Sequence, residues 1–171
     1  EIGVRLVGSE MCIRDRITVK AASTLAARLV AVYGTQVQTG IEGLTHSFPA
    51  PAAILALGEN ISEHLGKLGI ISARANTIYQ LARVLADEKN DFGFCGNPEE
   101  EMQKLQAIRG IGSWTAQYIA MRAMGWPDAF LPTDAGIKKA LPDHTPKELQ
   151  VLSEAWRPWR SYATVNLWNT L

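Results

Sequence analysis

Two glycines separated by one apolar residue, Gly110 and Gly112, lie between two stretches of helical pattern in the segment LQAIRGIGSWTA. Glycine permits backbone conformations that other residues avoid, so this spacing predicts a tight turn whose N–H groups no side chain shields. We expect the next helix to begin at Ser113 or Trp114, with the positive end of its dipole at the turn. Exposed amides at a helix start bind anions such as nucleic-acid phosphates. The pattern fits equally an ordinary helical hairpin whose first helix ends at a glycine.

The rest of the sequence predicts an all-α fold, because its apolar residues recur at helical spacing and no segment alternates as a strand does. Gly34 is expected to end an alanine-rich helix, Ser72 to cap the helix over 72–89, and Pro98 to open the helix before the glycine turn. The expected helices cover residues 17–34, 51–58, 61–69, 72–89, 98–108, 113–125, 134–141, 145–156 and 159–168.

Composition supports a folded protein but identifies no partner. Apolar residues make up 47% of the chain and charged residues 20%, which suits a packed core, and no run of about 18 apolar residues predicts a membrane span. Cys12 and Cys95 are too few for a disulfide framework, so we expect a reducing, cytoplasmic setting. The net charge is zero, although the stretch from Gln103 onward contains eight basic residues and five acidic ones. Any binding to DNA is therefore expected to be modest and salt-sensitive.

One aspartate and several aromatic residues are candidates for chemistry. Asp134 follows FLPT at an expected helix start, where aspartate is commonly an N-cap. Trp114 and Tyr118 are four residues apart and share a helix face, and aromatic residues at such spacing are commonly core. Trp156 and Trp159 are also expected in the core.

The segments LQAIRGIGSWTAQY and FLPTDAGIKKAL, with WRPWRSYATVNLW, resemble the AlkA-type DNA-3-methyladenine glycosylases II of the helix-hairpin-helix DNA glycosylase superfamily. The resemblance runs from about Ile17 to the C-terminus. It implies an all-α bundle of two helical subdomains around a cleft, with the helix-hairpin-helix at about 99–124. The implied activity is base-excision repair, in which the N-glycosidic bond of alkylated purines such as 3-methyladenine and 7-methylguanine is hydrolysed in duplex DNA.

The same resemblance implies a role for each matching residue. Asp134 is the catalytic carboxylate, and an aromatic base pocket favours cationic bases through cation–π attraction. Bifunctional relatives carry a Schiff-base lysine where this chain has tryptophan, so we expect a monofunctional enzyme. The implied pocket residues are Trp114, Tyr118 and Trp168, the implied phosphate contacts are Gly110, Gly112 and Thr115, and the implied ligands of a monovalent cation are the carbonyls of Gln106, Ile108 and Gly110.

The expected partner is double-stranded DNA with damaged bases, bound by a monomer that needs no membrane. No cysteine follows Cys95, so the iron–sulfur cluster of some relatives is not expected. A non-catalytic DNA-binding hairpin module stays open as the alternative, and so does a helical scaffold that binds other proteins.

Residues 1–16 do not match the family. The string SEMCIRDR resembles a translated sequencing adapter, which predicts a non-native segment, and a genuine but divergent helix is the alternative. The helical domain, 17–171, is then incomplete at its N-terminus. The apolar wedge that helps to flip the target base in the family aligns with Arg16, so base flipping is expected to suffer most.

Overall fold

The computed structural model describes residues 19–87 and 97–171. The adapter-like segment 1–16, the wedge position Arg16 and both cysteines lie outside the described residues. Within these two ranges the chain is helical and holds no strand beyond one isolated bridge between Gln36 and His46, as the all-α prediction requires. The chain divides into two compact units, one containing residues 19–87 and 107–111, the other 97–106 and 112–171.

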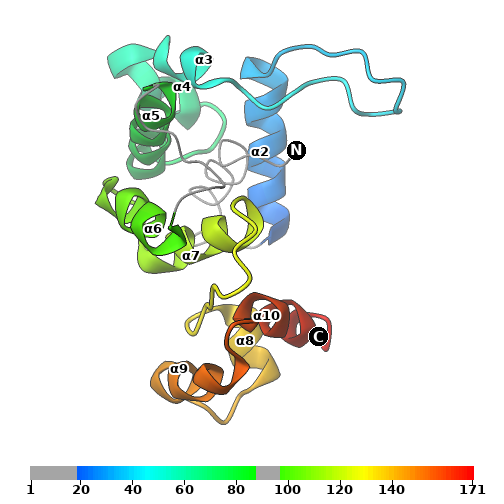
Figure 1. Cartoon of the computed structure of the whole chain (residues 1–171). Helices are drawn as coiled ribbons and strands as arrows, with labels where there is room; N and C mark the ends of the chain where they lie inside the picture. The colour runs from blue at the N-terminus through cyan, green and yellow to red at the C-terminus, as the bar shows by residue number, and fades with distance from the viewer. Residues whose placement is uncertain (1–18, 88–96) are drawn as a thin grey trace. The chain divides into compact units, whose positions relative to one another are not determined.

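The first unit is built on a long helix, α5 (Ser72–Ala86), which packs against α3 (Pro51–Leu55) and α4 (Ile61–Gly66) (Figure 1). A short 3-10 helix, η1 (Gly58–Asn60), joins α3 to α4, and α2 (Val19–Tyr33) ends before Gly34 as predicted. The buried aliphatic side chains of this unit include Ile54, Leu65, Ile78 and Leu81. These residues explain the helical spacing of apolar residues in the sequence.

The predicted N-cap at Ser72 is wrong by one residue. Ile71 has an extended backbone, and its carbonyl oxygen accepts hydrogen bonds from the N–H groups of Arg74 and Ala75. Ser72 is therefore already the first helical residue. The helix begins without a side-chain cap, so the position of the backbone turn, not the serine hydroxyl, sets its start.

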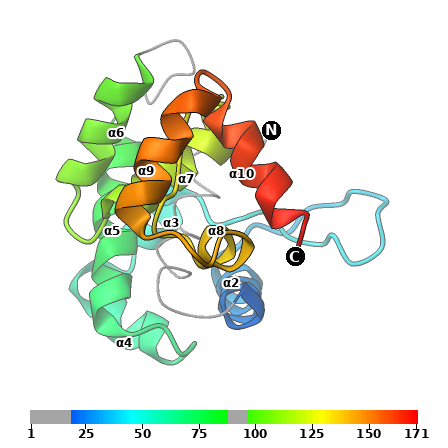
Figure 2. The ribbon, with the colours of Figure 1, turned by 90° about the horizontal axis from the view of Figure 1, so that it is seen from below.

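The second unit contains the remaining helices of the described residues, except for the last residue of α6: α6 (Pro98–Ala107), α7 (Ser113–Arg122), α8 (Ala135–Ala140), α9 (Pro146–Ser153), η2 (Glu154–Trp156) and α10 (Arg160–Trp168). Helices α8 and α10 pack against each other (Figures 1 and 2). Phe130, Ile137 and Leu149 form a buried core here. Because this core lies beside both α8 and α10, it fixes the helices that carry Asp134 and Trp168.

Of the two tryptophans expected in the core, one is partly buried against it and one is exposed. Trp156 packs edge-on against Phe130, with ring centroids 5.7 Å apart. Trp159 is 57% exposed and stands at the N-cap of α10, in contact with the equally exposed ring of Tyr162. The inner face of α10 is polar instead, made of Arg160, Ser161 and Thr164. The prediction for Trp159, which rested on its apolar residue type alone, is therefore wrong.

The first glycine of the hairpin motif is required by the fold. Gly110 has a φ of +96°, and a Cβ atom built on it would lie 2.0 Å from the hydroxyl oxygen of Thr77. Both the left-handed conformation and the contact with α5 exclude a side chain. The turn is closed by a hydrogen bond from the N–H of Ile111 to the carbonyl of Ile108.

We expect Gly110→Ala to lower the free energy of unfolding by about 3 kcal/mol, because backbone strain and steric overlap add. The matched control is Gly40→Ala, which has a positive φ but open space around the added Cβ. It should lose about 1 kcal/mol. Urea unfolding of both variants measures the difference. Equal losses in the two variants would mean that the contact with Thr77 does not constrain this turn.

Within the described ranges no helix is long and apolar enough to cross a membrane.

Candidate active site

Asp134 caps α8 and is the most densely hydrogen-bonded carboxylate of the second unit. Asp134 is 7% exposed, and its backbone is extended at the helix start. The Oδ1 atom accepts hydrogen bonds from the backbone N–H groups of Gly136 at 2.8 Å and Ile137 at 3.2 Å. The N-cap interpretation of this residue is therefore correct, and it fixes the carboxylate rigidly at the start of the helix.

Two indole N–H groups contact the same carboxylate. Trp168, the last residue of α10, donates from Nε1 to Oδ1 at 2.8 Å, and Trp114, from the first turn of α7, donates from Nε1 to Oδ2 at 3.3 Å. The Oδ1 atom thus accepts three hydrogen bonds, while Oδ2 accepts one long one. Since a carboxylate oxygen has about two lone-pair directions, the unused acceptor capacity of Asp134 is at Oδ2.

The three aromatic residues expected in a base pocket lie together beside this carboxylate. The rings of Trp114 and Tyr118 stack with centroids 5.3 Å apart, and Tyr118 lies 6.0 Å from the ring of Trp168. Tyr118 is only 8% exposed, whereas both indoles are half-buried. The structure therefore brings all four residues into one cluster, in which the two tryptophans offer the accessible aromatic surface.

The hairpin residues differ in whether the fold explains their residue type. Gly112 is the N-cap of α7, has an ordinary extended backbone, and would meet nothing within 4 Å if it carried a Cβ atom. The fold of the described residues therefore does not explain this glycine, whereas open backbone is what an approaching phosphate needs. Thr115 is 2% exposed, so only its position near the start of α7 is relevant to an anion.

The three carbonyls proposed from the resemblance as cation ligands are divided between the two units. Gln106 belongs to the second, and Ile108 and Gly110 to the first. The carbonyl of Ile108 already accepts a hydrogen bond from the N–H of Ile111 at 3.0 Å, which leaves one lone-pair direction for a ligand. A cation bound by these carbonyls stays a prediction.

A buried ion pair holds the loop that leads to Asp134. Asp128 and Arg160 are 6% and 5% exposed, and two parallel hydrogen bonds join them: Nε to Oδ1 at 2.7 Å and Nη2 to Oδ2 at 2.8 Å. Arg157 adds a third bond to Oδ2 at 2.6 Å. In addition, the hydroxyl of Ser161 donates to the carbonyl of Trp126 and accepts from the N–H of Ala129. The motif PWRSYA therefore acts here as a clamp between α10 and residues 126–129.

Burial raises the pKa of the Asp128 carboxyl, but hydrogen bonds and charge from Arg160, with the charge of Arg157, outweigh burial and hold it below its ordinary value of 3.8. A depressed pKa adds stability that is fully present above the ordinary value. This stability is lost as the pH falls through the pKa of the folded state.

We therefore expect the unfolding free energy of the chain to decline more steeply between pH 5 and pH 3 than that of Asp128→Asn. Urea unfolding at several pH values measures this difference. Parallel pH profiles would contradict the assignment.

Sequence reasoning missed Gly136 and the Asp128–Arg160 pair. A Cβ atom on Gly136 would lie 2.6 Å from Cδ1 of Trp168. Nothing in the sequence marks this glycine, since its neighbour in space is 32 positions away. The pair Asp128 and Arg160 is equally distant in sequence, and no pattern in the sequence indicated that these two residues meet.

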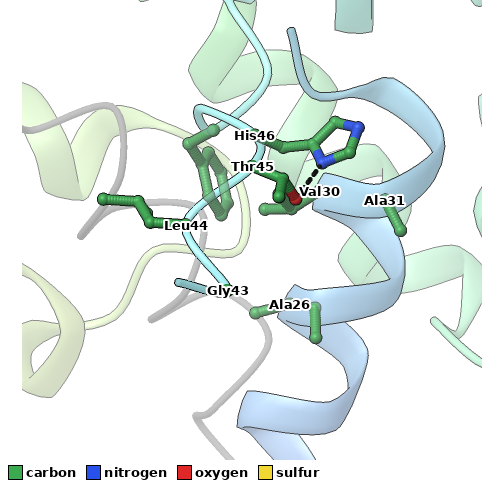
Figure 3. Close-up of a pocket in the computed structure, with 9 residues that line it drawn as sticks. Ala26, Val30, Ala31, Gly43, Leu44, Thr45 and His46 are labelled. Atoms are coloured by element: carbon green, nitrogen blue, oxygen red, sulfur yellow. Dashed lines mark hydrogen bonds between the residues drawn. The ribbon is translucent and has the colours of Figure 1, made fainter. Parts of the chain in front are cut away.

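A pocket of about 410 Å³ lies in the first unit between α2 and residues 43–48 (Figure 3). Its lining is mostly small and aliphatic, and includes Ala26, Val30 and Leu44. The two polar side chains, Thr45 and His46, are hydrogen-bonded to each other at 2.9 Å. The lining carries no group suited to bond cleavage beyond this satisfied pair, so the chemistry of the chain is better sought at Asp134.

No protein-family model matches the chain, but known proteins of similar sequence exist. It is 39% identical over 176 residues to the probable bifunctional transcriptional activator/DNA repair enzyme AlkA of Mycobacterium tuberculosis, covering 100% of this chain and 33% of that protein. It is 34% identical over 170 residues to DNA-3-methyladenine glycosylase 2 of Escherichia coli, covering 99% of this chain and 57% of that protein.

The fold has close structural neighbours. The 3-methyladenine DNA-glycosylase from Archaeoglobus fulgidus superposes with a TM-score of 0.83 at 23% identity, over 98% of this chain and 58% of that one. The chain therefore shares the helical fold of this DNA glycosylase. Its sequence homologues include AlkA-type DNA-3-methyladenine glycosylases, as the hairpin and FLPTD motifs predicted. The chain spans between one third and little more than half of the length of these two relatives.

The first alignment extends over residues 1–16 as well. The expectation of a non-native segment there stays a prediction, and so does the implied division into helical subdomains around a cleft.

Proposed function

We propose that this chain carries the catalytic part of a monofunctional DNA glycosylase that hydrolyses the N-glycosidic bond of alkylated purines in duplex DNA. The observation that carries the proposal is the buried carboxylate of Asp134, held by two indole N–H groups beside stacked aromatic rings. The names of the relatives, which include a DNA-3-methyladenine glycosylase 2, support it.

The chemistry follows from the free acceptor capacity of Asp134. As the base departs, the deoxyribose gains positive, oxocarbenium-like charge, which an ionised carboxylate beneath the sugar stabilises. Because Oδ1 is engaged by three donors, Oδ2 is the oxygen that faces the sugar or orients the attacking water. Rigid hydrogen bonding means that little reorganisation of the carboxylate is needed as the charge develops.

Base selection follows from the two half-buried indoles. A methylated purine such as 3-methyladenine carries positive charge, and an electron-rich ring stacked on it gains cation–π energy that a normal base does not provide. A cationic base also leaves without first accepting a proton. Trp114 cannot form a Schiff base with the sugar, so the product is an intact abasic site and not a strand break.

The start of α7 supplies the DNA contact. Its N–H groups at the helix start and the side-chain-free Gly112 suit a single phosphate, and Gly110 shapes the preceding turn. Carbonyl oxygens of the turn would hold a monovalent cation that adds positive charge toward the DNA. We further propose that the protein acts as a monomer in the cytoplasm, in association with the nucleoid.

A non-catalytic DNA-binding hairpin is the competing function. It would use the start of α7 in the same way, but it would have no use for a buried carboxylate beside two indoles. The density of donors around Asp134 therefore favours the enzyme.

Base release decides between the two functions. A duplex carrying 7-methylguanine or 3-methyladenine is incubated with the chain, and free base and strand breaks are measured separately. We expect released base and a strand that breaks only after alkali treatment. Salt-sensitive binding of the duplex without any released base would support the binding module, and strand cleavage without alkali would contradict monofunctional chemistry.

A further inference from the structure

We propose that Gly136 is a positioning residue that sets the place of Trp168 against Asp134. The backbone N–H of Gly136 donates to Oδ1 of Asp134 at 2.8 Å, and the indole of Trp168 lies directly over the same Cα. A Cβ atom on Gly136 would lie 2.6 Å from Cδ1 and 2.8 Å from Nε1 of that indole. No real Cβ atom tolerates such contacts, so any other residue here displaces the ring.

The backbone gives no reason for a glycine at this position. Gly136 stands in the first turn of α8 and is not among the glycines with a positive φ. Alanine would fit this helical conformation better, because glycine loses more backbone freedom on helix formation. What the missing side chain allows is the close approach of the indole, which brings Nε1 within 2.8 Å of Oδ1.

The position of Trp168 matters twice at this site. Its N–H group completes the set of three donors on Oδ1, which leaves Oδ2 as the oxygen with spare acceptor capacity. Its ring, 6.0 Å from that of Tyr118, also closes one side of the aromatic cluster. Gly136 therefore controls both the orientation of the carboxylate and the width of the cluster, although no side chain of its own touches either.

This inference rests on the proposed glycosylase function for its kinetic part, so its first test is independent of activity. The indole N–H resonance of Trp168 is identified in a ¹⁵N NMR spectrum as the signal lost in Trp168→Phe. In Gly136→Ala we expect this resonance to shift away from its hydrogen-bonded position while the signals of Trp156 and Trp159 stay in place. The matched control is Gly66→Ala, a helical glycine with open space around the added Cβ. It should leave all indole signals unchanged.

The second test measures single-turnover base release and duplex affinity. We expect Gly136→Ala to slow base release between about tenfold and a hundredfold, since small misplacements of a catalytic group have effects of this size, with unchanged affinity for undamaged duplex. Trp168→Phe removes the indole through which Gly136 acts. The double variant should therefore be no slower than Trp168→Phe alone.

The outcomes separate the two proposals. An unmoved Trp168 resonance in Gly136→Ala, or rate losses that multiply in the double variant, would overturn the role of Gly136. Absence of base release from the unmodified chain would instead count against the glycosylase function. The NMR result would still decide whether Gly136 sets the position of the Trp168 indole. Thermal unfolding of each variant confirms that the comparison is made between folded proteins.

Discussion

We expect Asp134→Asn to release alkylated base about a thousandfold more slowly than the unmodified chain, because the negative charge opposite the sugar is lost. The fold should survive the substitution. Asparagine is as good an N-cap as aspartate, and its amide oxygen can keep the hydrogen bonds from Gly136, Ile137 and Trp168. The amide NH₂ group then replaces Oδ2, so the long contact with Trp114 is the one that is lost. Binding of the duplex is expected to remain.

The measurement is single-turnover release of 7-methylguanine from a duplex in enzyme excess, with duplex affinity determined in parallel. Asp143→Asn is the matched control, because Asp143 is an exposed carboxylate of the same unit and its removal changes net charge equally. A rate for Asp134→Asn within tenfold of the parent would contradict the assignment of the catalytic carboxylate. A loss of duplex affinity equal to the loss of rate would show that Asp134 acts in binding and not in bond cleavage.

The role of Asp134 as a helix cap could be predicted from the sequence, but its contacts with two tryptophans could not. Its cap role follows from residue type and position, because a short acidic side chain before a helix satisfies N–H groups whatever the rest of the fold does. Its approach to Trp114 and Trp168 follows from neither. Those two residues are 20 and 34 positions away, and only the resemblance to a known family indicated that they meet.

Predictions of helix ends and turns were correct where the local backbone strongly favours one residue type. Gly34 and Gly110 end helices or shape turns as expected, since few other residues can. The start of α5 was missed by one residue, because an extended Ile71 opens the helix as well as a serine cap would. Trp159 was misplaced because burial depends on which face of α10 turns inward, and that face is chosen by the polar clamp of Arg160 and Ser161.

Breaking the buried clamp is expected to have the largest effect on stability. In Asp128→Asn, the guanidinium of Arg160 loses its bidentate carboxylate while remaining 5% exposed, and the one remaining partner is Glu154, whose Oε1 accepts from Nη1 at 3.2 Å. Because a buried guanidinium is then left with only one half-exposed counter-charge, we expect the free energy of unfolding to fall by about 3 to 5 kcal/mol. Urea unfolding at neutral pH measures the loss. Glu63→Gln, which breaks an exposed pair with Lys67, is the control and should leave the stability nearly unchanged.

The penalty in Asp128→Asn arises from the stranded charge more than from a lost attraction, and this origin has its own test. Removing both charges together, in Asp128→Leu with Arg160→Met, leaves no buried ion to desolvate, so most of the lost stability should return. Base release provides the link to function. Because the clamp fixes residues 126–129 only a few positions before Asp134, Asp128→Asn should also slow catalysis at temperatures where the variant is folded. If the double variant is as unstable as Asp128→Asn, the geometry of the two parallel hydrogen bonds, and not charge burial, holds this loop in place.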